Sequence, residues 1–276
     1  MSKKLRRSLS LARLMLVSHL MALLVVSPLA LPLRDGAESA EARAVGRSQA
    51  RKTQFTDDEI IEGFLRTAFG AEYHLAGRVD RIRKYDRPVR IAVGGISRPD
   101  RHTELARIVS DIARRVRHLD IALADEDSEA NVDVVFVRER ELPRTLARLY
   151  GRDRARDITE SLDPQCLSGF RKNDAFEIEH SDVILSIDTG EFTFRDCAYE
   201  ELLQSLGPIN DTDLPWTMFN DDVRMGHFGM YDQYLLNLLY DPRVRPGMTI
   251  TQVKDLLPQI LPEVRAWVEA NNNSPR

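Results

Sequence analysis

Hydrophobic residues recur along the chain with two different periods, and these periods predict where helices and strands lie. Spacing of three or four residues predicts helices over about 57–68, 101–118, 139–162, 197–206 and 231–240, and a last helix from 249 onward. Alternation with polar residues, or a short apolar run, predicts strands over 89–93, 121–124, 132–137 and 183–187. This order of strands and helices predicts a single α/β domain, in the broad sense that includes α+β.

Local signals support the first and last helices. Thr56 and Glu59 have the spacing of a capping box, and Thr249 begins the last helix in the same way. Pro258 and Pro262 lie inside that last helix, so we expect them to kink it.

The first 44 residues have the composition of an export signal. Basic residues within 3–13 precede an apolar run over 14–33. Ala42-Arg43-Ala44 then supplies the small residues that a signal peptidase needs, and Ala40-Glu41-Ala42 is a second possible cleavage site. We therefore predict a cleaved signal peptide over 1–44 and an exported protein, either periplasmic or secreted. The alternative is an uncleaved anchor, because the apolar run is about as long as a bilayer requires.

Charge narrows the choice of partners. Removing residues 1–44 takes away seven of 39 Lys and Arg and three of 43 Asp and Glu, which leaves a formal charge of −8. An acidic protein is a poor partner for nucleic acid, so we predict no nucleic-acid binding. The arginines within 101–118 interleave with a helical apolar stripe and form its solvent face. We expect contact with a membrane only through the signal segment.

The chain contains two cysteines, Cys166 and Cys197, and both belong to the exported part. A pair of cysteines in an oxidising compartment most often forms a disulfide. This bond would close a loop of about 30 residues and would stabilise the fold by roughly 3–4 kcal/mol through the unfolded state.

The segment 197–211 reads Cys-Ala-Tyr-Glu-Glu-Leu-Leu-Gln-Ser-Leu-Gly-Pro-Ile-Asn-Asp. It resembles the zinc helix of metzincin proteases, H-E-x-x-H-x-x-G-x-x-H, with the spacing kept and every histidine replaced. The resemblance puts the three metal ligands at Glu200, Gln204 and Asn210, the general base at Glu201 and the turn glycine at Gly207.

Two further features extend the resemblance. Met218 falls where the matrixin branch of the metzincins places a methionine under the metal, and the helix ending at Tyr240 is similar to a matrixin helix. A second resemblance rests on a longer set of residues: Cys197, Glu200-Glu201, Gln204, Leu206-Gly207, Asn210-Asp211, Phe219-Asn220-Asp221 and the run Leu-Tyr-Asp-Pro-Arg-Val-Arg-Pro-Gly-Met over 239–248. Through them, residues of about 80–250 resemble an uncharacterised bacterial domain-of-unknown-function family of exported proteins. Together they imply a zincin-like domain over 80–276, preceded by a leader and helix over 45–79. Its fold would be a twisted mixed sheet, a central helix and a helical C-terminal subdomain.

The replaced ligands change the chemistry that this segment supports. Glu, Gln and Asn offer oxygen donors, which suit Ca²⁺, Mg²⁺ or Mn²⁺ better than Zn²⁺. The following loop adds more carboxylates: Asp211, Asp213, Asp221 and Asp222. We predict no tightly held metal and no cofactor, and a weak divalent-cation site is the alternative.

Three functional hypotheses follow. The first is an exported pseudo-protease that serves as a binding module, whose degenerate cleft pairs an extended peptide or an envelope component along the sheet edge. Its polar floor would be Glu200, Glu201, Gln204, Asn210 and Asp211. The second is a hydrolase of peptide or cell-envelope bonds, with Glu201 as general base and a non-standard metal site. The third is that these residues form only a buried hydrogen-bond network that fixes the fold.

The rest of the sequence offers few other sites. No two histidines have the four-residue spacing of a helical metal site, so we interpret the following as surface or turn residues: His74, His102, His118, His180 and His227. The motif G-x-S-x-G is absent, and the predicted disulfide uses both cysteines. The plainest interpretation of helix 197–206 buries its leucines and leaves Glu200, Glu201 and Gln204 in water.

Overall fold

The computed structural model of this protein describes residues 52–70, 80–96, 98–125, 129–162, 165–220 and 222–273. The predicted signal peptide, most of the polar leader, His74 and Asp221 lie outside the described residues. Within the described ranges, no helix combines the length and the apolar composition that a membrane crossing needs.

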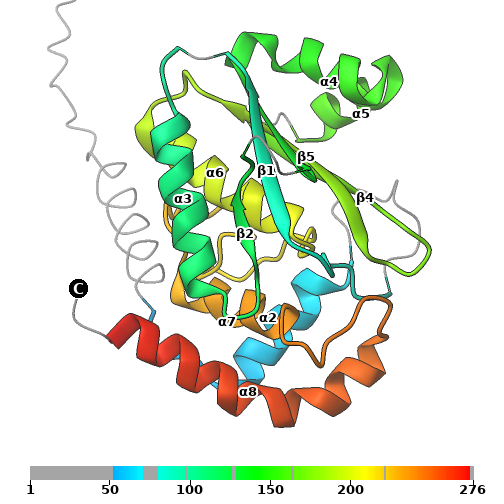
Figure 1. The fold of residues 1–276 in the computed structure, drawn as a ribbon, viewed down its shortest axis with the longest axis vertical. Helices are drawn as coiled ribbons and strands as arrows, with labels where there is room; N and C mark the ends of the chain where they lie inside the picture. Colours follow the sequence, from blue (N-terminus) through cyan, green and yellow to red (C-terminus); the bar gives the residue numbers. More distant parts are fainter. Residues whose placement is uncertain are drawn as a thin grey trace, which may run out of the picture. The chain divides into compact units, whose positions relative to one another are not determined.

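A five-stranded sheet lies at the centre of the domain (Figure 1). Its strands are β1 (Val89–Gly95), β2 (Ile121–Leu123), β3 (Val132–Val137), β4 (Cys166–Lys172) and β5 (Ile178–Ser186). They lie in the order β2-β1-β3-β5-β4, and every neighbouring pair is parallel except β4 with β5. The prediction of a single α/β domain with a mixed sheet is therefore confirmed, and β4 forms one edge of the sheet.

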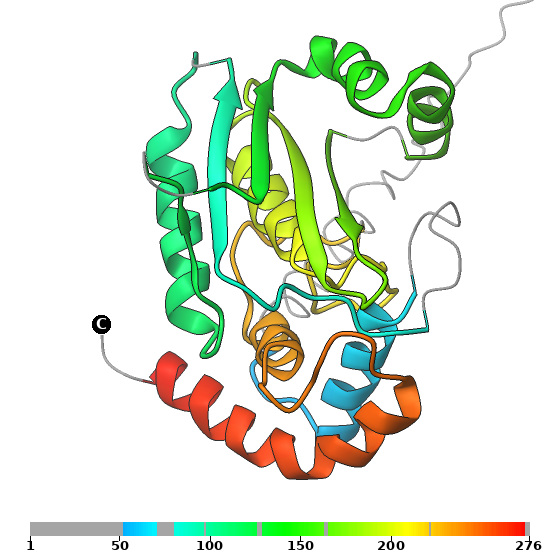
Figure 2. The same cartoon turned by 45° about the vertical axis from the view of Figure 1, so that its right-hand side comes forward.

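Seven α-helices accompany the sheet in the described ranges: α2 (Asp57–Ala68), α3 (His102–Arg115), α4 (Leu142–Tyr150), α5 (Arg152–Leu162), α6 (Glu191–Ser205), α7 (Met230–Leu239) and α8 (Ile250–Asn273). A short 3₁₀ turn, η2 (Glu139–Glu141), precedes α4. The predicted capping box is present at α2, where Thr56 and Glu59 each accept a hydrogen bond from the other's backbone N–H. Helix α8 continues through Pro258 and Pro262 and follows an arc in Figures 1 and 2, so the prolines do not end it.

Different helices pack against the two faces of the sheet. Val132, Val134 and Phe136 belong to the large core that α3 and α6 share, whereas Val135 and Val137 belong to a smaller cluster under α4 and α5. Alternate residues of a strand point to opposite faces, which explains this division. Figure 2 shows α6 passing behind the strands, with α4 and α5 gathered at one end of the sheet. Part of the second face therefore stays open to solvent.

The structure differs from the sequence-based expectation at three places. Helix α6 begins at Glu191 rather than Cys197, and β5 begins at Ile178 rather than 183. The apolar pattern also fails to predict β4, because Ser168 and Gly169 interrupt it and its last residues are basic. Pairing with β5 decides that this segment is a strand, and pairing is a long-range property.

The disulfide predicted between Cys166 and Cys197 is present, with a Cα–Cα distance of 5.9 Å. It joins the first residue of β4 to the middle of α6. The edge strand is therefore covalently fixed to the helix that packs under the sheet.

Replacing both cysteines with alanine should lower the free energy of unfolding by about 3–4 kcal/mol, because the bond joins residues 31 positions apart and restricts the unfolded chain. Urea unfolding of the oxidised parent and of C166A/C197A measures the difference. A loss below about 1 kcal/mol would show that the unfolded chain gains little freedom from the change.

Candidate functional site

Helix α6 carries most of the predicted site, and it is buried on almost every side. Leu202 and Leu203 are buried as expected, but so are Glu201, with 6% of its surface exposed, and Gln204, with 5%. Glu200 is partly buried. The interpretation that leaves Glu201 and Gln204 in water is wrong, because β4 and β5 cover the side of the helix that a surface helix would expose.

The helix ends where the sequence pattern places its turn glycine. Gly207 has a φ of +133°, and a Cβ there would collide with the carbonyl oxygen of Arg83. Both the backbone conformation and the close approach therefore require glycine. Tyr240, which is buried after α7, donates a hydrogen bond of 2.9 Å from its hydroxyl to the carbonyl oxygen of Leu206 at the helix end.

Gln204 uses both ends of its amide. Its Oε1 accepts a hydrogen bond of 3.3 Å from the Ser168 hydroxyl on β4, and its Nε2 donates one of 3.1 Å to Asp211 Oδ1. The predicted second ligand position is thus a bridge between the edge strand and the loop after α6. A buried amide with both groups bonded costs little, whereas the loss of one partner is expensive.

Asn210, the third ligand position, faces a different part of the fold. Its Nδ2 donates hydrogen bonds to the carbonyl oxygens of Arg66 (2.8 Å) and Asp211 (3.2 Å). A Cβ at Gly70 would lie 2.6 Å from Asn210 Cγ, so the end of α2 packs closely on this side chain. Among the predicted floor residues, the structure joins Gln204 to Asp211 directly, and it joins Asn210 to the backbone of Asp211.

Met218 lies in the core with 1% of its surface exposed, and its segment is tied to α7 by Asp232. Oδ1 of Asp232 accepts hydrogen bonds from the Thr217 hydroxyl and from the Met218 N–H. Asp232 is fully buried, and this burial raises its pKa to about 7. Asp232 is not among the residues predicted from the sequence, although a single acid at the start of an otherwise apolar helix is a usable signal.

A second group of polar residues lies on the open face of the sheet. Asp133 of β3 stands opposite Asp182 of β5, and His180 lies two residues before Asp182 on the same face. His180 Nε2 is 3.5 Å from Asp133 Oδ2 and 3.6 Å from Asp182 Oδ1. A protonated imidazole or a divalent cation would relieve the repulsion between the two carboxylates, and the donor set suits either one. Among the described residues, this is the group with the geometry of a metal site.

A family model described as a protein of unknown function (DUF2927) matches residues 57–259. The chain belongs to the DUF2927 family. The match begins at the first residue of α2 and ends within α8, so it includes the whole sheet, α6 and the loop after it. It extends beyond the 80–250 expected for a domain-of-unknown-function family. Neither the curated proteins nor the solved structures contain a match to this DUF2927 protein.

The bridge made by Gln204 should contribute to stability in this DUF2927 domain. Gln204→Leu removes the acceptor for the buried Ser168 hydroxyl and a donor to Asp211, so it should lower the free energy of unfolding by about 1–3 kcal/mol. Ser168→Ala should cost less in the Gln204→Leu background than in the parent, because its partner is already gone. A double-mutant cycle by urea unfolding measures this coupling. Strictly additive losses would mean that the two side chains do not interact.

The buried carboxylate of Asp232 should make stability depend on pH. The folded protein keeps this proton up to about pH 7, whereas an unfolded aspartate releases it near 3.8. As the pH rises from about 4 to about 7, the free energy of unfolding of the parent should therefore fall by up to about 4 kcal/mol relative to that of Asp232→Asn. Urea unfolding at several pH values compares the two, with Asp153→Asn on exposed α5 as the matched control. Parallel profiles for the parent and Asp232→Asn would contradict this assignment.

Proposed function

We propose that this protein is an exported binding module that holds an extended peptide along β4, above a polar floor on α6. The observation that carries the proposal is the position of β4. It is the outer strand of the sheet, it runs antiparallel to β5, and in the described part of the chain no further strand pairs with its other side. The free edge of a strand offers backbone donors and acceptors to a second extended chain.

The attachment of β4 to α6 supports a rigid site. The Cys166–Cys197 bond fixes the start of the strand, and the hydrogen bond from Ser168 to Gln204 fixes its middle. An edge held in this way loses little conformational entropy when a peptide binds, which favours affinity.

Within this proposal the domain is zincin-like, and its ligand positions have taken on binding and structural roles. Several features favour this interpretation: a helix packed under the sheet, an antiparallel edge strand above it, a glycine turn at Gly207 and the buried Met218 that follows. Gln204 bridges Ser168 and Asp211, which suits a floor residue. Glu200, Glu201 and Asn210 would complete the floor.

Export is part of the proposal. The disulfide is typical of proteins that fold in an oxidising compartment, which supports a periplasmic or secreted location. An extended peptide from an exported or envelope protein is then the partner that this compartment would supply.

A hydrolase of peptide or cell-envelope bonds is the second candidate. One observation favours it: Glu201 is a buried carboxylate on the helix under the edge strand, and such carboxylates are frequent among catalytic bases. This candidate predicts that a bound peptide is cut, whereas the binding module leaves it intact.

Amide hydrogen exchange tests the binding proposal. The purified protein is incubated with a pool of random acetylated decapeptides, and the exchange of individual amides is followed by NMR. Peptide binding should slow exchange at alternate residues of β4, because every second N–H of a strand points outward. The opposite edge strand, β2, serves as the internal control. Equal slowing of amide exchange in β4 and β2, or slowing confined to other segments, would contradict the proposal.

Mass spectrometry of the same pool separates the two candidates. An unchanged pool supports a binding module. Cleavage by the parent that Glu201→Gln abolishes, with β4 protection retained, would replace the binding module with the hydrolase.

A further inference from the structure

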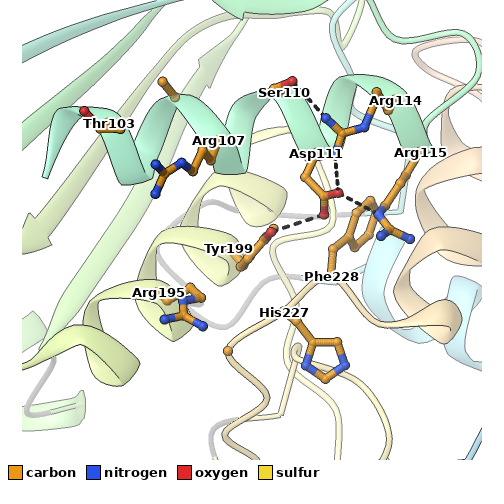
Figure 3. Close-up of a pocket in the computed structure, with 12 residues that line it drawn as sticks. Thr103, Arg107, Ser110, Asp111, Arg114, Arg115, Arg195, Tyr199, His227 and Phe228 are labelled. Carbon is orange, nitrogen blue, oxygen red and sulfur yellow. Dashed lines mark hydrogen bonds and ion pairs between the residues drawn. The ribbon is translucent and has the colours of Figure 1, made fainter. Parts of the chain in front are cut away.

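A pocket of about 680 Å³ lies between α3, the first half of α6 and the loop before α7 (Figure 3). Helix α3 contributes Arg107, Asp111 and Arg114 at spacings of three and four residues, which place them on one side of the helix. Helix α6 contributes Arg195 and Tyr199, one turn apart. Segments that are distant in the sequence therefore form one concave surface, separate from the β4 edge.

The lining of this pocket carries more positive than negative charge. Four arginines line it, and Asp111 is the one acidic lining residue. Asp111 accepts hydrogen bonds from Arg114 (2.8 Å), Arg115 (2.9 Å) and the Tyr199 hydroxyl (3.1 Å). Glu104, outside the lining, lies 3.4 Å from Arg195. Glu104 also pairs with Arg101 at 2.9 Å, so the lining itself, with four arginines and one acid, carries a formal excess of three positive charges.

Arg107 is the lining arginine whose guanidinium is available to bind an anionic ligand. Its side chain is exposed, and within the described ranges no hydrogen bond or ion pair joins it to another residue. Figure 3 shows its guanidinium on the side of α3 that faces α6, where the Arg195 side chain also lies. A guanidinium presents parallel N–H donors that match two oxygens of one anionic group.

The loop that forms the third wall is fixed to α6. The buried Asp196 accepts hydrogen bonds from the N–H groups of Met225 (2.8 Å) and Gly226 (2.7 Å). Gly226 has a φ of +63°, and a Cβ there would lie 2.8 Å from the ring of Phe192. His227 Nδ1 lies 2.8 Å from the Met225 carbonyl oxygen and donates a hydrogen bond to it, which fixes the ring beside the loop.

We propose that this pocket binds a phosphate group, held by Arg107 and Arg195, with His227 at the rim. The excess of positive charge matches a phosphate group, which carries up to two negative charges, better than a single carboxylate. Inorganic phosphate and phosphate monoesters present this group in solution, and the headgroup of an anionic phospholipid presents it as a singly charged diester. The site is independent of peptide binding at β4, so either proposal can fail alone.

Isothermal titration calorimetry with inorganic phosphate, at low ionic strength, tests the soluble source. Co-sedimentation with phosphatidylglycerol vesicles, against phosphatidylcholine vesicles, tests the lipid source. Both are run on the parent, R107A, R107K and the matched control R156A, which removes an exposed arginine from α5. R107A should weaken binding about tenfold or more, because a hydrogen bond to a charged group is lost. The affinity of R107K should lie between those of the parent and R107A, because lysine keeps the charge but lacks the paired donors of a guanidinium.

Saturable binding of either probe that depends on Arg107 supports the site, and the probe that binds identifies the source. Arg107 is exposed and has no hydrogen bond or ion pair with other described residues, so R107A should keep the parent's circular dichroism and unfolding midpoint. R195A, which also loses the contact with Glu104, is the second variant and should weaken binding as well. No saturable binding of either probe up to about 10 mM overturns the proposal. An equal loss of affinity in R107A and R156A also overturns the proposal, because such a loss would reflect only the change in net charge.

Discussion

The burial of α6 under the sheet is the constraint on which the rest of this structure depends. A buried helix must find a partner for each of its polar groups, because water does not reach them. The partners come from several elements around α6. Ser168 on β4 donates a hydrogen bond to Gln204, and the backbone of the loop before α7 donates two to Asp196. The Tyr240 hydroxyl donates one to the carbonyl oxygen of Leu206. The disulfide from Cys197 adds a covalent contact with β4. These contacts determine where the edge strand, the loop and α7 can lie.

Helix α7 shows the same need for partners, with two buried ionisable side chains. Asp232 lies in its first turn, and the ammonium of Lys84 donates hydrogen bonds to three carbonyl oxygens at its other end, those of Leu239, Asp241 and Val244. Burial lowers the pKa of Lys84 to about 8, and the three carbonyl oxygens replace the water that the ammonium loses. The Lys84 ammonium at the C-terminus matches the helix dipole, whereas Asp232 at the N-terminus keeps its proton up to about pH 7 and holds the 217–218 segment by hydrogen bonds. One buried cation and one buried acid therefore help to position α7 in the core.

The two surfaces proposed for binding share α6 as their common support. Gln204, near its C-terminal end, faces β4, whereas Tyr199 reaches Asp111 of α3. A site built on a rigid, buried helix keeps its geometry better than a site built on loops alone. This arrangement lets one element position a strand edge and a basic pocket that are chemically unrelated.

The sequence by itself determined what depends on local sterics and composition. The capping box at Thr56, the strand at 132–137, the Cys166–Cys197 bond and the turn at Gly207 all follow from residues close together in the chain, or from pairing the two cysteines present. Only the tertiary structure decided that Glu201 and Gln204 are buried, because the same polar spacing suits a solvated helix equally well. Strand register also brought His180 beside Asp133, and helix packing placed Arg107 and Arg195 in the lining of one pocket, across long separations that no local pattern encodes.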